Sequence, residues 1–240
     1  MKAKNPPKSQ QPAIAARLRE TGWLAERPAD VQAVILEAAI WHRAVPGEEF
    51  IHGPSNEGGI YVIADGIAEV SFVLANPDNR AQYFVRAGFW SGHRPLLGRA
   101  RTLSITARTP LVWGAVPLAR LRQMLVAEPA WWEHIAQLAE DSAELVCWAM
   151  ADLTLTDSRA RIAGLLLQLA GCRRPDDAGR KPLSIELSQS DIATVAAMSR
   201  STLGKILAEF TKNGWVETCY TRLEVRAPEQ LRALVNGAAD

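Results

Sequence analysis

The sequence predicts an α+β fold in which an N-terminal antiparallel β-roll of the double-stranded β-helix or jelly-roll type precedes a long helix and a C-terminal helical domain. Three observations predict it. Short apolar runs separated by glycines fill the stretch from Ala44 to about Leu121, a helical stretch follows to about Leu153, and two capped helical segments lie within residues 187–216. The 240 residues, 48% of them hydrophobic, suffice for two modest domains.

The first 23 residues are expected to form a flexible tail and a first helix. Helical periodicity covers Ala13 to Leu24 and then Pro28 to Ala39, where Asp30 is the expected cap. The residues before Ala13 are polar and contain proline, and no apolar run there resembles a signal peptide or a membrane span. We therefore expect a cytoplasmic protein that makes no membrane contact.

Residues 24–128 are expected to form the roll. Runs rich in Val, Ile, Phe and Tyr alternate with turns, as in a small antiparallel barrel or roll. The runs are Phe50–Gly53, Ile60–Ile63, Ala68–Val73 and Tyr83–Val85. The glycines expected at the corners are Gly47, Gly66, Gly88 and Gly92.

Residues 129–156 are expected to form a helix that pairs with a second copy of the chain. Pro129 is tolerated in a first helical turn. The expected dimer seam follows an imperfect heptad pattern. Its members are Ile135, Leu138, Ser142, Leu145 and Ala149. Further apolar residues on this helix indicate that it packs against both the roll and a partner; the alternative is a core helix in a monomer. Residues 156–158 then interrupt the pattern, which predicts a hinge and a new N-cap.

Residues 157–240 are expected to form a winged helix-turn-helix. Ser188 with Asp191, and Ser199 with Thr202, are cap signatures only a few residues apart, so two short helices must cross steeply. Ala197 stands in the turn, where a left-handed backbone favours glycine, and it accepts a modest strain there. Two alternating strands within residues 215–225 predict the wing, and Pro228–Val235 predicts a closing helix.

The second of these helices leaves a polar and basic face opposite its apolar stripe. Arg200 is expected to contact guanine, and Lys205 a base or a phosphate. Phosphate contacts are expected from the helix N-terminus, its hydroxyl groups and the wing. The full set of expected DNA contacts is Gln189, Ser199, Arg200, Ser201, Thr202, Lys205 and Arg222. The alternative is an ordinary helical hairpin with a solvated face.

The charge distribution favours DNA binding only slightly. Residues from Arg159 onward hold 12 Lys and Arg against 9 Asp and Glu, whereas residues 1–158 hold 15 against 17. The three cysteines, Cys147, Cys172 and Cys219, form no CxxC pattern, so no metal site is expected. Their sparse, odd number suits a reducing compartment.

Taken in order, these parts resemble the Crp/Fnr superfamily of bacterial transcription regulators. The resemblance covers nearly everything from about Leu24 to Val235. It rests on residues 157–163 (DSRARIA), 199–205 (SRSTLGK) and 88–92 (GFWSG). It implies a cyclic-nucleotide-binding-type roll, a homodimer, a palindromic double-stranded operator and RNA polymerase as a partner.

The resemblance also implies an effector pocket, which can be compared residue by residue. Gly92, Arg101 and Thr102 are similar to the family's cassette for a sugar and a cyclic phosphate. His93 replaces the family's ribose-binding Glu, and Val146 and Cys147 replace the Thr-Ser pair that meets adenine. Because these replacements remove polar contacts, we do not expect ordinary cyclic AMP control. Either another effector of unknown identity binds, or none does and Arg101 is a structural residue.

Other cofactors and activities remain alternatives. No cysteine precedes Cys147, which excludes the iron–sulfur cluster of oxygen-sensing relatives. The candidate haem ligands are His42, His52, His93 and His134, and Cys147 is a candidate redox thiol. No catalytic motif is present, so we expect no enzyme. The alternative function is a sensor of another nucleotide, haem or redox state whose main output is protein contact.

Overall fold

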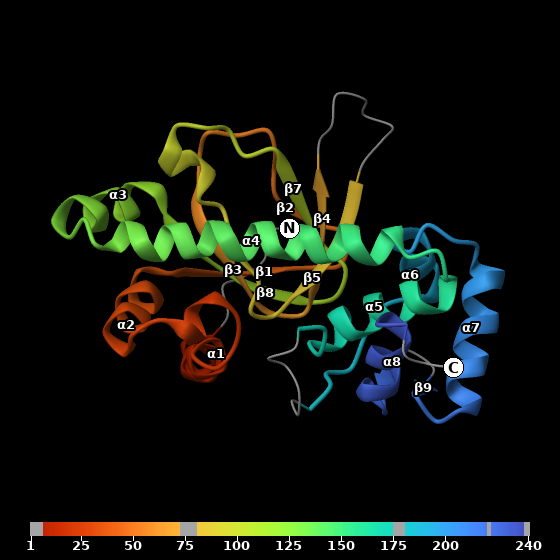
Figure 1. Cartoon of the computed structure of the whole chain (residues 1–240). Helices are drawn as coiled ribbons and strands as arrows, with labels where there is room; N and C mark the ends of the chain where they lie inside the picture. Colours follow the sequence, from red (N-terminus) through yellow and green to blue (C-terminus); the bar gives the residue numbers. More distant parts are fainter. Residues whose placement is uncertain (1–6, 73–80, 175–180, 220–221, 238–240) are drawn as a thin grey trace. The chain divides into compact units, whose positions relative to one another are not determined.

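The computed structural model describes residues 7–72, 81–174, 181–219 and 222–237. The chain packs as two compact units, Met1–Leu145 and Val146–Asp240, so the division falls inside the long helix (Figure 1). The first unit contains α1 (Gln11–Leu18), α2 (Ala29–Ala38), β1 (Ile40–Ala44), β2 (Glu49–Ile51), β3 (Gly59–Asp65), β4 (Ile67–Phe72), β5 (Ala81–Arg86), β6 (Trp90–Ser91), β7 (Leu103–Ala107), β8 (Leu111–Pro117), α3 (Leu118–Ala127) and most of α4 (Trp131–Thr154).

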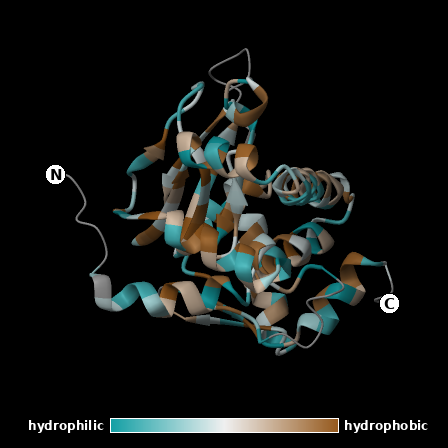
Figure 2. Cartoon of the chain, turned by 90° about the vertical axis from the view of Figure 1, so that its left-hand side faces the viewer, coloured by the Kyte–Doolittle hydropathy of each residue, from teal (hydrophilic) through white to brown (hydrophobic). Residues whose placement is uncertain are grey.

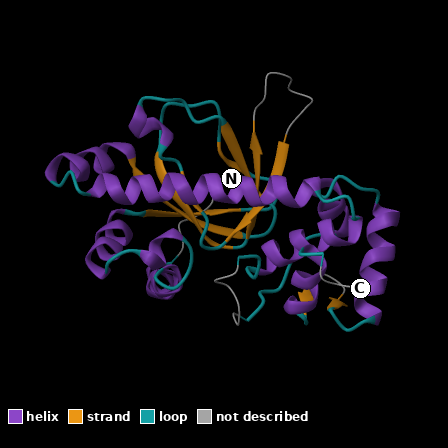
Figure 3. Ribbon diagram, viewed as in Figure 1, coloured by secondary structure: helices purple, strands orange, loops and turns teal. Residues whose placement is uncertain are grey.

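The strands of the first unit form the expected antiparallel roll. One sheet has the order β1-β8-β3-β6 and the other β2-β7-β4-β5, and each pairing is antiparallel. Figure 3 shows these strands in orange. The four predicted corner glycines all have positive φ, between 86° and 105°. The predicted fold class is therefore confirmed.

Strand β3 is apolar along its length because both of its faces are covered. Ile60 and Val62 belong to a core shared with the helices, whereas Tyr61 and Ile63 belong to the core between the two sheets. Alternate residues of a strand point to opposite faces, so a continuous apolar run is what a doubly covered strand needs. Figure 2 shows hydrophobic stretches, in brown, along strands of the roll.

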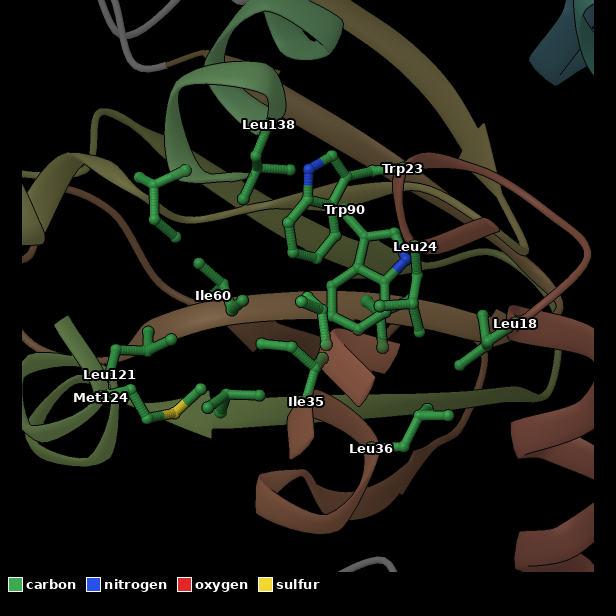
Figure 4. Packing of buried hydrophobic residues seen from close by; sticks show 14 of the residues in the cluster. Leu18, Trp23, Leu24, Ile35, Leu36, Ile60, Trp90, Leu121, Met124 and Leu138 are labelled. Carbon is green, nitrogen blue, oxygen red and sulfur yellow. The ribbon is translucent and has the colours of Figure 1, made fainter. Parts of the chain in front are cut away.

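The helices at the start of the chain are shorter than predicted. Helix α1 ends at Leu18, and the stretch up to Leu24 continues as a separate 3₁₀ helix, Trp23–Glu26. The backbone turns at Gly22, whose φ is 69°. The expected cap of α2 is also wrong, since Pro28 occupies the N-cap position and Asp30 lies in the first turn. These helices cover one sheet of the roll, where Trp23 and Trp90 pack with ring centroids 5.3 Å apart (Figure 4).

The face of α4 that was expected to pair with a second copy packs instead on its own unit. Ile135 and Leu138 are 4% and 0% exposed and belong to the core beneath the helices, where Leu138 lies beside the two tryptophans (Figure 4). Leu145 packs against the core between the sheets. Ser142 is half-buried and its hydroxyl donates to the Leu138 carbonyl. Ile135 and Leu138 are therefore committed to the core of their own unit, and Ser142 and Leu145 are partly buried there.

The second unit contains the end of α4, α5 (Ser158–Ala170), α6 (Gln189–Val195), α7 (Arg200–Lys212), the hairpin β9 (Val216–Cys219) and β10 (Arg222–Val225), and α8 (Pro228–Val235). Asp157 caps α5, as predicted, by accepting from the Arg159 amide at 2.8 Å. The expected hinge is braced by Arg161, which donates to the Leu155 carbonyl at 3.0 Å and to the Ser158 hydroxyl at 3.1 Å. The strand prediction for Tyr220 and Thr221 lies outside the described residues.

None of the helices that the structure describes combines the length and the apolar character needed to span a bilayer.

Candidate nucleic-acid interface

Both caps that predict the helix-turn-helix are formed. The Ser188 hydroxyl accepts from the Asp191 amide at 3.1 Å, and the Ser199 hydroxyl accepts from the Thr202 amide at 3.0 Å. Between the two helices Ala197 has a φ of 51°, and no other non-glycine residue of the described chain has a positive φ. The turn therefore has the left-handed backbone that its sequence position predicts, at a modest conformational cost.

The strain at Ala197 leads to a stability prediction. We expect Ala197→Gly to raise the free energy of unfolding by about 0.5–1 kcal/mol, because the relief of left-handed strain exceeds the extra entropy of glycine in the unfolded chain. Ala197→Val is the matched comparison and is expected to destabilise, since a β-branched residue tolerates this conformation poorly. Urea unfolding measures both, and a glycine variant less stable than the parent would contradict the assignment of strain.

Helix α7 buries one stripe and exposes the residues predicted to contact DNA. Leu203, Ile206, Leu207 and Phe210 are at most 6% exposed. Arg200, Ser201 and Lys205, which we call the recognition face, are exposed. Among the described residues neither basic member of this face has an ion-pair partner. Full positive charge is therefore available at the N-terminal half of α7.

The hydroxyl groups at the start of α7 are partly committed to the cap. Ser199 Oγ and Thr202 Oγ1 lie 2.8 Å apart, and the former also accepts from the Thr202 amide. Ser201 is exposed and has no such role. Gln189, the first residue of α6, is exposed and lines a groove beside α7.

This groove, of about 500 Å³, runs between α7, the start of α6 and strand β9. Its lining residues are Gln189, Gly204, Leu207, Ala208, Thr211, Lys212 and Thr218. Apart from Gln189, none of these was predicted as a contact residue. The helical spacing of Ser201, Lys205, Ala208 and Lys212 is the sequence signal that could have extended the recognition face along the helix.

The wing carries its charges in pairs. Arg222 Nε lies 3.0 Å from a carboxylate oxygen of Glu224, and Arg226 lies 2.5 Å from Glu217 and 2.7 Å from Glu224. Glu217 and Glu224 are directly opposite across the hairpin, where like charges repel unless a cation bridges them. The hydrogen bond and charge of Arg226 lower the pKa of Glu217 below its usual range. Arg222 thus stays a predicted phosphate contact that already has an acidic partner.

In the roll, Gly92, Tyr61, Ser91 and Arg101 lie near one another where the effector pocket was expected. Gly92 has a φ of 105°, and a Cβ there would lie 2.3 Å from the Gly59 carbonyl oxygen and 2.7 Å from the Tyr61 ring. Only glycine fits this position. Burial raises the pKa of Tyr61 to about 12, while the Ser91 hydroxyl and the Arg101 guanidinium act in the opposite direction. Tyr61 and Ser91 were not predicted as part of this site, because in sequence they lie in ordinary strand segments.

The Arg101 guanidinium is occupied by the backbone of the roll. It donates to the His52 carbonyl at 2.9 Å and to the Glu57 carbonyl at 3.3 Å, and the Arg101 backbone pairs with Ser55. The side chain is 6% exposed, so these contacts compensate its burial. The sequence left two roles open for Arg101, phosphate binding and a structural role in the roll. These contacts favour the structural role.

The remaining predicted pocket residues differ in their surroundings. His93 is half-buried at the start of the 3₁₀ helix Arg94–Leu97, and burial, followed by the charge of Arg94, lowers its pKa. Its ring is therefore uncharged at neutral pH. Thr102 is exposed in the first unit, whereas Val146 and Cys147 are exposed residues of the second unit.

The histidines named as candidate haem ligands each have separate surroundings. His42 stacks on Trp113 with ring centroids 4.4 Å apart, and burial lowers its pKa. His52 Nδ1 lies 3.0 Å from Glu49, and His134 meets Trp131 edge-on. Within the described part of the chain, no group of three or more His, Cys, Asp or Glu side chains is placed to hold a metal ion.

The described chain thus combines a roll of two antiparallel sheets, a long helix and a winged helix-turn-helix. Residues 160–234 match the model of the Crp-like helix-turn-helix domain. The chain is 30% identical over 116 residues to the CRP-like cAMP-activated global transcriptional regulator of Mycobacterium tuberculosis. These matched residues make up 48% of this chain and 52% of that protein. The chain thus matches about half the length of this curated relative.

Solved structures show the same fold. A CRP-family transcriptional regulator of Thermus thermophilus aligns with a TM-score of 0.61 at 22% identity, covering 82% of this chain and 98% of that one. FixK2 of Bradyrhizobium japonicum aligns with a TM-score of 0.63 at 17% identity, covering 82% and 96%. Residues 160–234 therefore form a Crp-like helix-turn-helix domain, the chain shares the fold of these solved structures, and its curated relative is named as a transcriptional regulator.

Proposed function

We propose that the protein is a homodimeric transcription regulator that binds a palindromic operator in double-stranded DNA. The observation that carries this proposal is the helix-turn-helix, with two capped helices, a left-handed turn at Ala197 and an unpaired basic face on α7. In such motifs the second helix enters the major groove with its N-terminal residues toward the bases.

The assignment of roles follows from position along α7. Arg200, at the N-terminal end, pairs with O6 and N7 of guanine through its planar fork. Lys205, a little over one turn later, contacts a base or a phosphate, and Ser201 lies between them on the recognition face. Gln189, Ser199 and Thr202 contact phosphates near the two helix N-termini.

The role of Arg200 gives the next prediction. We expect Arg200→Ala to cost about 1–3 kcal/mol in operator binding and to relax sequence preference at one position of each half-site, because a bidentate contact to guanine is lost. Competition binding with operator duplexes that vary that base measures both effects. Since Arg200 is exposed and unpaired, the variant should fold normally. Equal losses on operator and random DNA would contradict a base-reading role.

Dimerisation is proposed through a different stripe of α4 from the one that the sequence indicated. Seven residues recur with alternating steps of four and three, as in a coiled-coil seam. They are Trp132, Ala136, Ala139, Ala143, Val146, Met150 and Leu153. The four large members are at least 42% exposed in the single chain, and the small alanines allow close helix approach. Of the predicted seam residues, Ala149 is half-buried and lies next to this stripe.

Control by cyclic AMP in the ordinary way is not part of the proposal, although the Mycobacterium tuberculosis relative is named as cAMP-activated. Support comes from the Arg101 guanidinium, which already binds two backbone carbonyls, and from the uncharged His93. The guanidinium keeps its positive charge, but two of its N–H groups are already engaged by carbonyls, and His93 adds no positive charge. If a different effector acts, we place its site around Gly92, His93, Arg101 and Thr102 in the roll.

The proposed partners are operator DNA, a second copy of the chain and RNA polymerase, and the proposed location is the cytoplasm, where those partners are found. A sensor whose main output is protein contact is the competing function. Salt-dependent, sequence-specific affinity for a duplex separates the two.

The deciding experiment is selection of duplexes from a random pool, with and without cyclic AMP or cyclic GMP. We expect one palindrome to be enriched equally under all conditions. Enrichment only with a cyclic nucleotide would overturn the proposed independence. No enrichment under any condition would overturn DNA-sequence recognition and favour the protein-contact sensor.

A further inference from the structure

The basic residues of α7 and of the wing fall into two electrostatic groups. Arg200, Lys205 and Lys212 lie on α7, and within the described chain none of them pairs with a carboxylate. The two wing arginines, Arg222 and Arg226, both pair with carboxylates. With two arginines and two glutamates, this ion-pair cluster of the wing has no net charge.

Lys212 lines the groove between α7 and β9. This groove continues the recognition face toward the C-terminus of α7. Gly204 has no side chain and Ala208 only a methyl group, so both leave the groove open. The Thr211 and Thr218 hydroxyls and the Gln189 amide supply hydrogen-bond donors. No carboxylate lines the groove. The groove therefore suits a nucleic-acid strand, whose sugars present apolar surface and whose phosphates are anionic.

The distance along α7 indicates which part of DNA reaches this groove. At about 1.5 Å per residue, Lys212 is about 18 Å from Arg200 along the axis, whereas the major groove is about 12 Å wide. With Arg200 at the bases, Lys212 lies beyond the groove edge, beside the sugar–phosphate strand that borders it. A flexible ammonium group suits a phosphate there.

We propose that the groove between α7 and β9 holds one sugar–phosphate strand of the operator, with Lys212 as its phosphate-binding cation, and that Glu224 and Glu217 restrain the wing arginines from that role. The inference rests on the proposed function. It adds Thr211, Lys212 and Thr218 to the DNA-contacting surface and ranks Lys212 above Arg222.

A comparison of Lys212→Gln with Arg222→Gln tests the proposal, since each removes one exposed positive charge from the same unit. Operator and random duplexes are titrated with full-length protein over a series of salt concentrations. We expect Lys212→Gln to weaken both duplexes alike and to reduce the slope of log K against log salt by about 0.9, as for one lost phosphate contact. We expect Arg222→Gln to leave the slope nearly unchanged.

Two further variants sharpen the result. Ala208→Glu, at an exposed helical position, places a carboxylate in the groove and should weaken both duplexes. Glu224→Gln releases Arg222 and should steepen the salt slope. A slope loss for Arg222→Gln as large as that for Lys212→Gln, or no loss for Lys212→Gln, overturns the proposal. If the unaltered protein binds no duplex at all, the proposed function itself has failed, and that outcome is distinct from failure of the groove.

Discussion

Replacing Met150 by glutamate is expected to convert the proposed dimer into a monomer and to weaken operator binding by about 10²–10⁴-fold. Met150 is 61% exposed and lies within the apolar stripe of α4. In a parallel pair of helices the two introduced carboxylates would face each other across an apolar seam, where burial of unpaired charge is unfavourable. The two recognition helices would then bind half-sites independently and lose their high effective concentration.

Light scattering after gel filtration measures the mass, and binding to a full palindrome and to an isolated half-site measures the affinity. Ala151→Glu is the matched control, because residue 151 is exposed, next in sequence and outside the stripe. That variant should stay dimeric and bind normally. A dimeric Met150→Glu protein would show that the seam lies elsewhere, and a monomer with undiminished palindrome affinity would show that dimerisation is not needed for binding.

Removing the Asp152 carboxylate is expected to destabilise the second unit by about 3–5 kcal/mol. Asp152 and Arg173 form a two-pronged salt bridge at 2.6 and 3.1 Å, and both residues are at most 9% exposed. The Arg173 guanidinium also lies 4.6 Å from the Trp148 ring. Gly164 makes room for the pair, since a Cβ there would lie 2.6 Å from the carboxylate. The last turns of α4 are thereby attached to α5 and the residues that follow it.

Asp152→Ala leaves a buried guanidinium without its partner, which is the source of the expected loss. Denaturant unfolding monitored by circular dichroism measures it, and hydrogen exchange of α5 amides localises it. The double variant Asp152→Ala/Arg173→Met should recover most of the stability, because it removes both charges. Glu209→Ala is the control: it breaks the half-exposed pair with Arg159 and should cost at most about 1 kcal/mol. Equal losses for Asp152→Ala and Glu209→Ala would contradict a special role for the buried pair.

The helix-turn-helix could be predicted from sequence because its determinants are local. Each cap joins residues three apart, and the apolar stripe of α7 repeats within the same helix. The left-handed turn at Ala197 is equally local. The corner glycines of the roll follow the same principle, since positive φ is a property of the single residue.

The dimer seam shows where local pattern fails. Two adjacent stripes of α4 both follow a heptad spacing, one containing Ile135 and Leu138 and the other containing Val146 and Met150. Periodicity gives no reason to prefer either. Only the packing of Leu138 into the core that also holds Trp23 and Trp90 assigns the first stripe to the interior and leaves the second exposed. The prediction therefore identified a helix with two apolar faces, but it could not tell that Ile135 and Leu138 are buried within their own unit.

Charged side chains show the same limit. From its place on the wing, Arg222 was predicted to contact a phosphate, whereas for Arg101 phosphate binding and a structural role were both left open. In the structure Arg101 contacts carbonyls 44 and 49 residues away, and Arg222 pairs with a glutamate on its own strand. The residue type does not indicate which partner an arginine has. Whether its guanidinium is free to bind a phosphate depends on its contacts in the folded chain.

By itself, the sequence determined the order of the parts, the two-faced long helix, the caps and turn of the helix-turn-helix and the basic recognition face. These follow from backbone preference and from periodicity within one element. Tertiary structure decided which stripe of α4 is exposed, that Asp152 pairs with Arg173, that the wing arginines are paired and that a groove extends to Lys212. The reason is that burial and ion pairing depend on which elements meet in space, and that is set by the folded chain as a whole.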